Sequence, residues 1–299
     1  MQQDISNFEA TQLLSILQQL RIISENKIDA ATEQWLLTNL KRFTTDQIFV
    51  HLTAEKSFPQ IKRLTINEKV KEDRRNDRLH ELSHIKYHPF PEKISWYGRA
   101  NMKKQSVLYA GFYTTTILNE IKPKVGQLFT VSTWRCSDTE KLTLCPIFKN
   151  WMRPDNVVND FYLSSVNNYN RLIKQLPKNI AQVSDELIQF IADAFIKRVE
   201  ETDEYGYFFS AYFGSFMLND FETNDGKPID AIVYPSVAED GEFSNVAIKP
   251  QVFDRVYPQP YEVEEFLVES TPTINSPGYS AIRCGRTNNF DIEKGKILW

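Results

Sequence analysis

The sequence predicts an α+β protein, in which a helical N-terminal region precedes a mixed β core with helices. Apolar residues recur with helical spacing near the N-terminus, and a second amphipathic pattern covers residues 184–203. Short apolar runs at 106–110, 231–234 and 244–248 are typical of buried strands. The two kinds of pattern together indicate the α+β class.

The first 55 residues are predicted to form three helices. The first helix carries an apolar stripe formed by Leu13, Leu14, Ile16, Leu17 and Leu20. Asp29 is a candidate cap for a second helix, and Asp46 for a third that contains Ile48, Phe49 and Leu52. No cluster of acids, bases or nucleophiles occurs here, so we predict a helical N-terminal domain, residues 1–75, that serves regulation or assembly.

A densely charged run, residues 68–80, is predicted to be a solvated helical connector. The domain boundary is placed near this run, so that residues 76–299 form the second domain. Its first strand is predicted at 106–110 and another at 126–132, whereas 145–183 is predicted to be irregular. Ser184 is a candidate cap for the helix 184–203, and the tail 262–299 is expected to mix strand and loop.

Composition narrows the function classes. The 299 residues carry a formal net charge of −4 and a pI of about 5.7, which does not favour general nucleic-acid binding. Three cysteines without a Cys-x-x-Cys motif fit a reducing cytosol, and the polar, acidic N-terminus is unlike a signal peptide. The apolar stretch 205–218 is shorter than the roughly 20 residues that cross a bilayer. We therefore expect a cytoplasmic protein without a membrane segment, and a buried helix or strand at 205–218.

The stretch 98–122 places a cation, an aromatic ring and a carboxylate at regular separations. Arg99 and Tyr109 are ten residues apart, and Glu120 follows eleven residues later. Thr114 and Thr115 are candidate caps for a short helix that Pro123 ends, with Glu120 on its last turn beside the strand of Tyr109. Such a cleft would suit a ligand with phosphates, a flat ring and a sugar that develops positive charge. Ordinary surface and core roles for the three residues remain the alternative.

A second candidate motif covers His80 to His84. It reads HELSH and matches the H-E-x-x-H pattern of zinc hydrolases. On a helix the two histidines would face the same way, Glu81 would act as general base, and His88 would offer a further ligand. Pro89 and Pro91 would end such a helix at once, and no histidine follows His88. A zinc-dependent hydrolase is therefore kept as an alternative function.

The motifs GRAN, VLYAG and LNEIKP in residues 98–123 resemble the start of a RES domain, a family named for its Arg, Glu and Ser. A later stretch, 232–250, reads IVYPSVAEDGEFSNVAIKP and resembles the second half of the same pattern. The implied domain runs from about Lys86 to Tyr261, with an insertion at about 137–225. The resemblance implies a core like that of ADP-ribosyltransferases and an activity that consumes NAD.

The resemblance also assigns roles to individual residues. Arg99 would bind a phosphate through its planar fork, Tyr109 would stack on the nicotinamide, and Glu120 would face the ribose as positive charge develops. Ser236 would position the ribose or Glu120. Trp96, Tyr97 and Asn245 complete the expected NAD-binding set. NAD is expected as the substrate, and no metal or other cofactor is required.

The function expected from the resemblance is that of a toxin or anti-phage effector that cleaves the nicotinamide–ribose bond, by hydrolysis or phosphorolysis, and arrests growth by depleting NAD. An antitoxin or other defence partner, and a homo-oligomer, are the expected protein partners. An ADP-ribosyltransferase that modifies a cellular target is an alternative, because the acceptor depends on access and geometry. A binding module without activity, in which Arg99 and Glu120 form a structural ion pair, is a further alternative.

Overall fold

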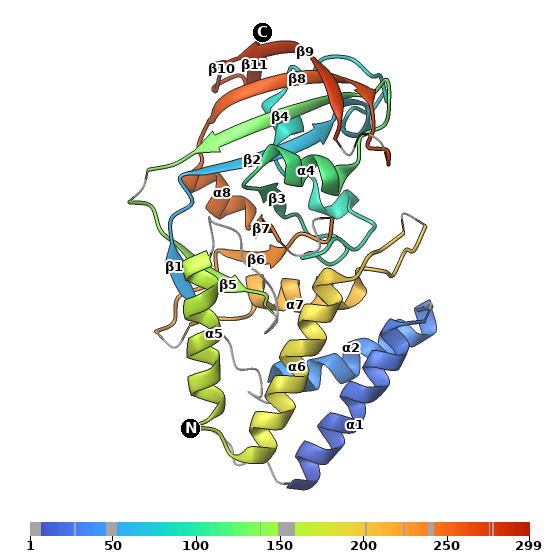
Figure 1. The fold of residues 1–299 in the computed structure, drawn as a ribbon, viewed down its shortest axis with the longest axis vertical. Helices are drawn as coiled ribbons and strands as arrows, with labels where there is room; N and C mark the ends of the chain where they lie inside the picture. Colours follow the sequence, from blue (N-terminus) through green and yellow to red (C-terminus); the bar gives the residue numbers. More distant parts are fainter. Residues whose placement is uncertain are drawn as a thin grey trace. The chain divides into compact units, whose positions relative to one another are not determined.

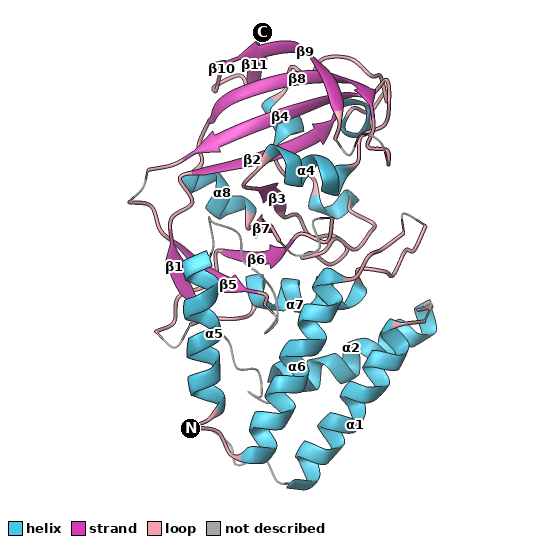
Figure 2. Cartoon of the chain, in the orientation of Figure 1, coloured by secondary structure: helices cyan, strands magenta, loops and turns pink. Residues whose placement is uncertain are grey.

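The computed structural model describes residues 7–26, 28–45, 53–137, 139–148, 159–200, 202–223, 225–238, 242–274, 276 and 278–299. The chain divides into two compact units that interleave along the sequence (Figures 1 and 2). Unit 1 contains residues 1–54, 95–103 and 143–235, and unit 2 contains residues 55–94, 104–142 and 236–299. Helices, parallel strands and antiparallel strands all occur, which confirms the predicted α+β class.

Unit 1 is built largely from helices. It contains α1 (Asn7–Ser24), α2 (Ala30–Thr45), α5 (Asn159–Ile173), α6 (Lys178–Ile196) and α7 (Phe208–Asn219). Helix α1 packs along α6, and the predicted apolar stripe supplies Leu13, Leu17 and Leu20 to the buried core. Arg21 of α1 forms ion pairs with Glu186 and Asp193 of α6, at 3.0 and 3.2 Å. The unit also holds the parallel strands β5 (Leu142–Pro146) and β6 (Ala231–Pro235).

Unit 2 is built around six antiparallel strands in the order β7-β3-β2-β4-β8-β9. These strands are β7 (Ser244–Ile248), β3 (Leu108–Gly111), β2 (Gln60–Ile66), β4 (Leu128–Arg135), β8 (Pro260–Ser270) and β9 (Ser280–Thr287). Shorter elements complete the unit: β1 (Ala54–Lys56), α3 (Asn67–Val70), the 3-10 helices η1 (Leu82–Ile85) and η2 (Pro91–Lys93), α4 (Thr114–Ile121), α8 (Pro250–Val256), β10 (Asn289–Asp291) and β11 (Lys296–Leu298).

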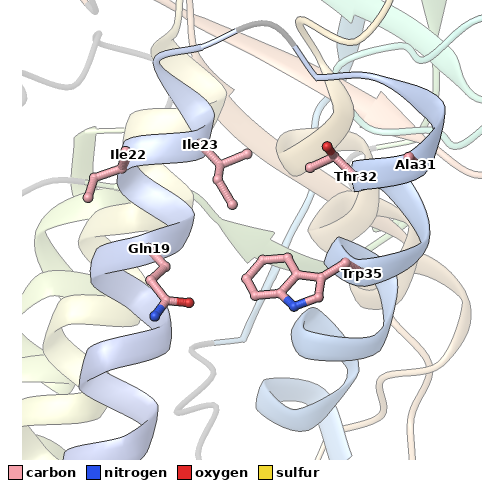
Figure 3. Close-up of a pocket in the computed structure, with 6 residues that line it drawn as sticks. All are labelled: Gln19, Ile22, Ile23, Ala31, Thr32 and Trp35. Atoms are coloured by element: carbon pink, nitrogen blue, oxygen red, sulfur yellow. The ribbon is translucent and has the colours of Figure 1, made fainter.

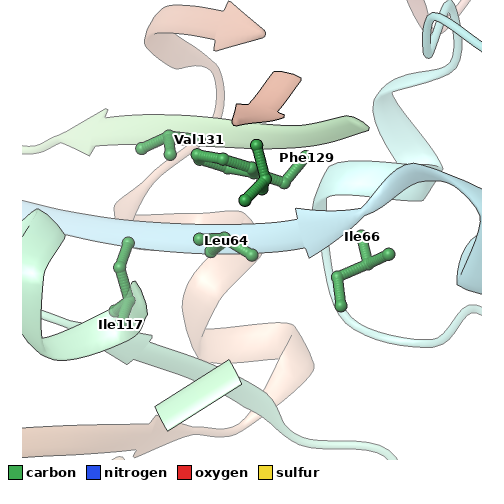
Figure 4. Close-up of a cluster of buried hydrophobic side chains, with 6 residues drawn as sticks. Leu64, Ile66, Ile117, Phe129 and Val131 are labelled. Carbon is green, nitrogen blue, oxygen red and sulfur yellow. The ribbon is translucent and has the colours of Figure 1, made fainter. Parts of the chain in front are cut away.

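Helix α4 covers one face of the sheet in unit 2. Ile117 of α4 packs with Leu64 and Ile66 of β2 and with Phe129 and Val131 of β4 (Figure 4). Residues 64 and 66, and 129 and 131, lie two apart on their strands, so these side chains share one face of the sheet. The contact fixes α4 against the sheet and thereby sets the position of its last turn, which carries Glu120.

Several local predictions are confirmed. Asp29 caps α2, because its carboxylate accepts a hydrogen bond from the backbone N–H of Thr32 at 2.8 Å. The strands predicted near 106–110, 126–132, 231–234 and 244–248 correspond to β3, β4, β6 and β7. The apolar stretch 205–218 contributes the buried helix α7. The third predicted N-terminal helix, from Asp46, lies outside the described residues.

Other local predictions are wrong. The predicted irregular region 145–183 contains α5 and the start of α6, and Ser184 lies inside α6 instead of capping it. The charged run 68–80 is helical only to Val70, and Arg74 beyond it has a φ of 54°. The N-terminal cap position of α4 is Tyr113, not Thr114 or Thr115, and its side chain makes no cap hydrogen bond.

The helical description of residues 1–75 holds for α1 and α2 but not for residues 54–56 and 60–66, which form β1 and β2. The predicted boundary at residue 75 falls within unit 2, and the predicted insertion at 137–225 overlaps the third segment of unit 1. The division into domains 1–75 and 76–299 stays a prediction. Across the described ranges, no helix has the length and apolarity that a bilayer crossing requires.

Candidate functional site

The carboxylate of Glu120 is held by three donors within unit 2. Its Oε1 accepts hydrogen bonds from Ser236 Oγ at 2.6 Å, Val237 N at 3.0 Å and Asn245 Nδ2 at 3.0 Å. Its Oε2 accepts none from the residues that the structure describes. Three donors on one oxygen fix the orientation of the carboxylate and leave the other oxygen available to a ligand.

Two chain segments bring these donors to Glu120. Ser236 follows β6, and its backbone N–H donates to the carbonyl of Phe243 at 2.7 Å, which closes the connection towards β7. Asn245 lies on β7 directly opposite Gly111 of β3. The side chains of Ser236 and Asn245 are 0% and 5% exposed, so their donors are buried and directed at a single acceptor. The arrangement is therefore preorganised before any ligand arrives.

Gly111 of β3 allows α4 to pack closely against the sheet, and the arrangement around Glu120 depends on this contact. A Cβ at this position would lie 2.7 Å from Cγ2 of Ile117 and 3.3 Å from Oδ1 of Asn245. The first distance is far below van der Waals contact, so a larger residue would push α4 away from the sheet. The ring of Tyr113 also packs against that of Phe243 with centroids 5.3 Å apart, which braces the start of α4.

Tyr109 shares a sheet face with Asn245. Tyr109 pairs with Ala247 in the same register that pairs Gly111 with Asn245, and alternate residues of a strand point to one face. The half-buried ring of Tyr109 and the amide of Asn245 are therefore diagonal neighbours across two strands. The sequence prediction that Tyr109, Glu120, Ser236 and Asn245 belong together is consistent with this placement in one unit.

Arg63 of β2 supports the backbone beside this group, although it lies outside the sequence motifs that predicted the site. Its Nη1 donates to the carbonyl oxygen of Tyr109 at 3.0 Å, while its buried Nε has no partner among the described residues. Burial lowers the pKa of the Arg63 guanidinium to about 10, so the group is still charged at neutral pH. No motif surrounds Arg63, and only the pairing of β2 with β3 reveals its position.

Arg99 lies in unit 1, where protein groups engage its guanidinium. Nη1 donates to the carbonyl oxygens of Phe195 and Lys197, at the C-terminal end of α6, and Nη2 donates to Tyr207 Oη at 3.3 Å. The guanidinium also stacks over the Tyr207 ring, 4.7 Å from its centroid. A cation at this end of a helix is favourable because the last carbonyl groups carry partial negative charge. These contacts give Arg99 a structural role, and its phosphate-binding role stays a prediction.

Tyr97 and Trp96 also belong to unit 1. Tyr97 is buried, donates a hydrogen bond to Glu33 Oε1, and packs edge-on against Phe208. Burial, followed by the Glu33 contact, raises the pKa of Tyr97 above its usual value. Trp96 is 51% exposed. Ordinary packing thus accounts for Tyr97, and the ligand-wall role of both residues stays a prediction.

The HELSH residues do not lie on one helix. The 3-10 helix η1 covers Leu82–Ile85, so His80 precedes it, and Glu81 forms an isolated bridge and an ion pair with Lys296. His84 is half-buried, and this burial lowers the pKa of its imidazole. Among the described residues no three His, Cys, Asp or Glu side chains gather as metal ligands. The helical geometry expected for an H-E-x-x-H zinc site is therefore not present.

An open apolar groove of about 530 Å³ lies between α1 and α2 in unit 1 (Figure 3). It is lined by Gln19, Ile22 and Ile23 of α1 and by Ala31, Thr32 and Trp35 of α2. The Trp35 indole points across the groove towards α1. No acid, base or nucleophile lines it, so it has none of the groups that chemistry at a sugar or phosphate needs.

Neither a scan of protein-family models nor a search of curated proteins found a match to this chain. The geometry around Glu120 and the sequence motifs that surround it are therefore the features that bear on function.

Proposed function

We propose that this protein cleaves the nicotinamide–ribose bond of NAD, as a RES-type enzyme with an ADP-ribosyltransferase-like core. The observation that carries the proposal is the carboxylate of Glu120, held by three donors on Oε1 with Oε2 left open. Ser236 and Asn245, which the sequence motifs had assigned to the same site, supply two of those donors.

In the proposed reaction the bond between C1′ of the ribose and the nicotinamide nitrogen breaks, and its electron pair neutralises the pyridinium ring. Positive charge then develops over C1′ and the ring oxygen of the ribose, as in glycoside hydrolysis. Water adds to C1′ and loses a proton, which gives ADP-ribose, nicotinamide and one proton. Phosphate as the acceptor gives the corresponding phosphorolysis.

Glu120 supplies the electrostatic part of this mechanism. Its open Oε2 accepts a ribose hydroxyl and places negative charge beside the developing cation. The donors from Ser236, Val237 and Asn245 hold the carboxylate in place, so little reorganisation is needed during the reaction. Tyr109, whose backbone Arg63 supports, forms an aromatic wall for the nicotinamide.

The proposed biological consequence is NAD depletion and growth arrest, as expected of a toxin or anti-phage effector. Such an activity must be restrained in its own cell, so an antitoxin or defence partner is proposed with it. Transfer of ADP-ribose to a cellular target uses the same bond cleavage with a different acceptor.

The direct test is to incubate the purified full chain with NAD and to measure released nicotinamide, with and without a strong chelator. We expect release that the chelator leaves unchanged, with ADP-ribose or ADP-ribose 1″-phosphate as the second product. Release that is lost with chelator and restored by zinc would instead support the HELSH alternative. Tight NAD binding without any release would favour the binding module.

A further inference from the structure

An open groove of about 600 Å³ lies at the start of β8, in unit 2. Its walls combine aromatic rings, side-chain amides and apolar side chains, which come from Gln259, Pro260, Tyr261, Asn288, Asn289, Phe290, Leu298 and Trp299. None of these lining residues has a charged side chain. The groove therefore suits a flat, uncharged group that carries hydrogen-bonding atoms on its edge.

A β-bulge places Tyr261 at the groove. Glu262 of β8 lies opposite Thr133 of β4, and Pro260 lies opposite Trp134, so Tyr261 is an extra residue without a partner on β4. Bulges of this kind re-aim a side chain and are frequent next to functional sites. The result is an aromatic side chain that lines the groove and is 50% exposed.

Arg135 of β4 stacks on the ring of Tyr261. The centre of its guanidinium lies 3.5 Å from the ring centroid, and its Nε donates to Gln60 Oε1 at 3.0 Å. Arg135 is not one of the residues that line the groove, so it covers a face of the ring that the groove leaves aside. The ring is thereby held in place, and its other face is open to a stacked planar group.

The opposite wall is also fixed within the fold. Nε1 of Trp299 donates to the carbonyl oxygen of Leu79 at 2.7 Å, and the guanidinium of Arg78 lies 4.6 Å from the Trp299 ring centroid. The buried hydroxyl of Thr287 accepts from the backbone N–H of Asn289 at 3.1 Å, which holds the short connection from β9 to β10. Both walls are therefore positioned before a ligand arrives.

The amides of Gln259, Asn288 and Asn289 are exposed, and they form no hydrogen bond with the residues that the structure describes. Each amide offers a ligand both donors and an acceptor. An Asn or Gln amide pairs at two points with adenine, whose edge presents an amine donor beside a ring nitrogen acceptor. A sugar fits less well, because no carboxylate lines the groove to accept its hydroxyl groups.

From these observations we propose that the groove binds the purine base of a nucleoside or nucleotide, adenine in particular. The base stacks on Tyr261, and its edge pairs with the amides. Four strand spacings, about 19 Å, separate β8 from β7, which carries Asn245 of the Glu120 group. The groove is therefore a second site, and the inference does not depend on the proposed cleavage of NAD.

The test irradiates the full chain with 2-azidoadenosine and maps the labelled peptides by mass spectrometry. We expect label within residues 259–261 or 288–299, and protection by unmodified adenosine. In Tyr261→Ala this label should disappear, and the affinity for adenosine in calorimetry should fall roughly fivefold to a hundredfold, as expected for the loss of one stacking partner. Tyr261→Phe keeps the ring and should bind like the parent.

Phe90→Ala is the matched control. The ring of Phe90 is also 50% exposed in unit 2 and also lies beside a cation, Lys93 Nζ, at 4.6 Å from its centroid. This variant should keep the labelling and the affinity of the parent. Equal losses in Phe90→Ala and Tyr261→Ala would overturn the inference, because they would not be specific to the groove.

Asn288→Ala decides the question if Tyr261→Ala does not fold, because it removes an exposed amide that forms no described hydrogen bond. Weaker adenosine binding in Asn288→Ala supports the inference, and parental binding rejects it. Label confined to other segments of the parent, or binding of methyl glucoside in place of adenosine, would also overturn it.

Discussion

At the scale of single residues, the two arginines beside the predicted motifs have different tasks. Arg63 donates to the backbone of Tyr109, and Arg99 donates to two carbonyl oxygens at the end of α6. The GRAN motif singles out Arg99 because a planar guanidinium suits a phosphate, but the same planar fork also suits converging carbonyl groups. Sequence spacing does not distinguish these partners.

The Arg99→Lys variant tests whether Arg99 serves the fold, through the carbonyl groups, or binds a phosphate. A lysine keeps the charge but cannot donate to Phe195, Lys197 and Tyr207 together, so we expect a loss of about 1–3 kcal/mol in the free energy of unfolding. Chemical denaturation followed by circular dichroism measures this loss. A variant with the stability of the parent and a raised KM for NAD would contradict the structural role and support the phosphate clamp.

The two motifs that resemble RES domains assign Glu120, Ser236 and Asn245 to one site, whereas the spacing of these residues alone leaves ordinary roles open. Ser236 and Asn245 meet Glu120 in the structure, although more than 100 residues separate them from it in the sequence. Arg63 was missed because a single basic residue in a strand has no local signature. Only the pairing of β2 with β3 shows that it lies beside Tyr109.

At the scale of elements, the contact between α4 and β3 decides where Glu120 lies. The sequence predicted both elements, since an apolar run and an amphipathic stripe are local patterns. It missed α5 and the start of α6, where polar residues weaken the apolar pattern and tertiary packing stabilises the helices. It also left β2 unassigned, although this strand lies in the middle of the unit 2 sheet.

Gly111→Ala tests the contact between α4 and β3. The new Cβ would lie 2.7 Å from Cγ2 of Ile117, so we expect a loss of roughly 1–3 kcal/mol in stability and a lower kcat as Glu120 shifts. Ile117→Leu removes the Cγ2 branch, and the double variant should recover part of both losses. Equal stability and turnover in parent and Gly111→Ala would show that α4 is not fixed in this way. A double-mutant cycle gives the coupling energy directly.

At the scale of the whole molecule, the first two helices make several buried contacts within unit 1. Leu36, Leu40 and Phe43 of α2 are fully buried, and Glu33 of α2 accepts hydrogen bonds from both Tyr97 and Tyr205. An amphipathic pattern in the sequence shows that one face of a helix is buried, but it does not show against which segment the helix packs. A deletion of residues 1–72 would also remove β2, so we expect such a fragment not to fold.

The Tyr97→Phe variant tests whether the contact between Tyr97 and Glu33 of α2 stabilises the fold, because the free energy of unfolding that this contact contributes depends on pH. Burial and Glu33 raise the pKa of Tyr97 above the usual 10.0, so its contribution to stability is fully present below about pH 10 and is lost as the pH rises further. The free energy of unfolding of the parent should therefore fall above about pH 10, and less steeply in Tyr97→Phe. The other tyrosines with raised pKa values keep the remaining slope. Parallel curves for the two proteins would contradict the assignment to Tyr97.

The negative charge of Glu120 is the feature on which the proposed activity depends most. Glu120→Gln keeps the size of the side chain and an oxygen that can accept from Ser236 and Asn245, but it removes the negative charge beside the ribose. Groups that act mainly in the transition state lower turnover when removed and leave affinity for the substrate largely intact.

The most direct measurement is therefore nicotinamide release by parent and Glu120→Gln, with NAD affinity measured by calorimetry on the same preparations. We predict that kcat falls by about 10²–10³-fold or more, while the Kd for NAD stays within a few-fold of the parent value. Near-parental turnover in Glu120→Gln would contradict the assignment of Glu120 as the carboxylate that stabilises the developing positive charge.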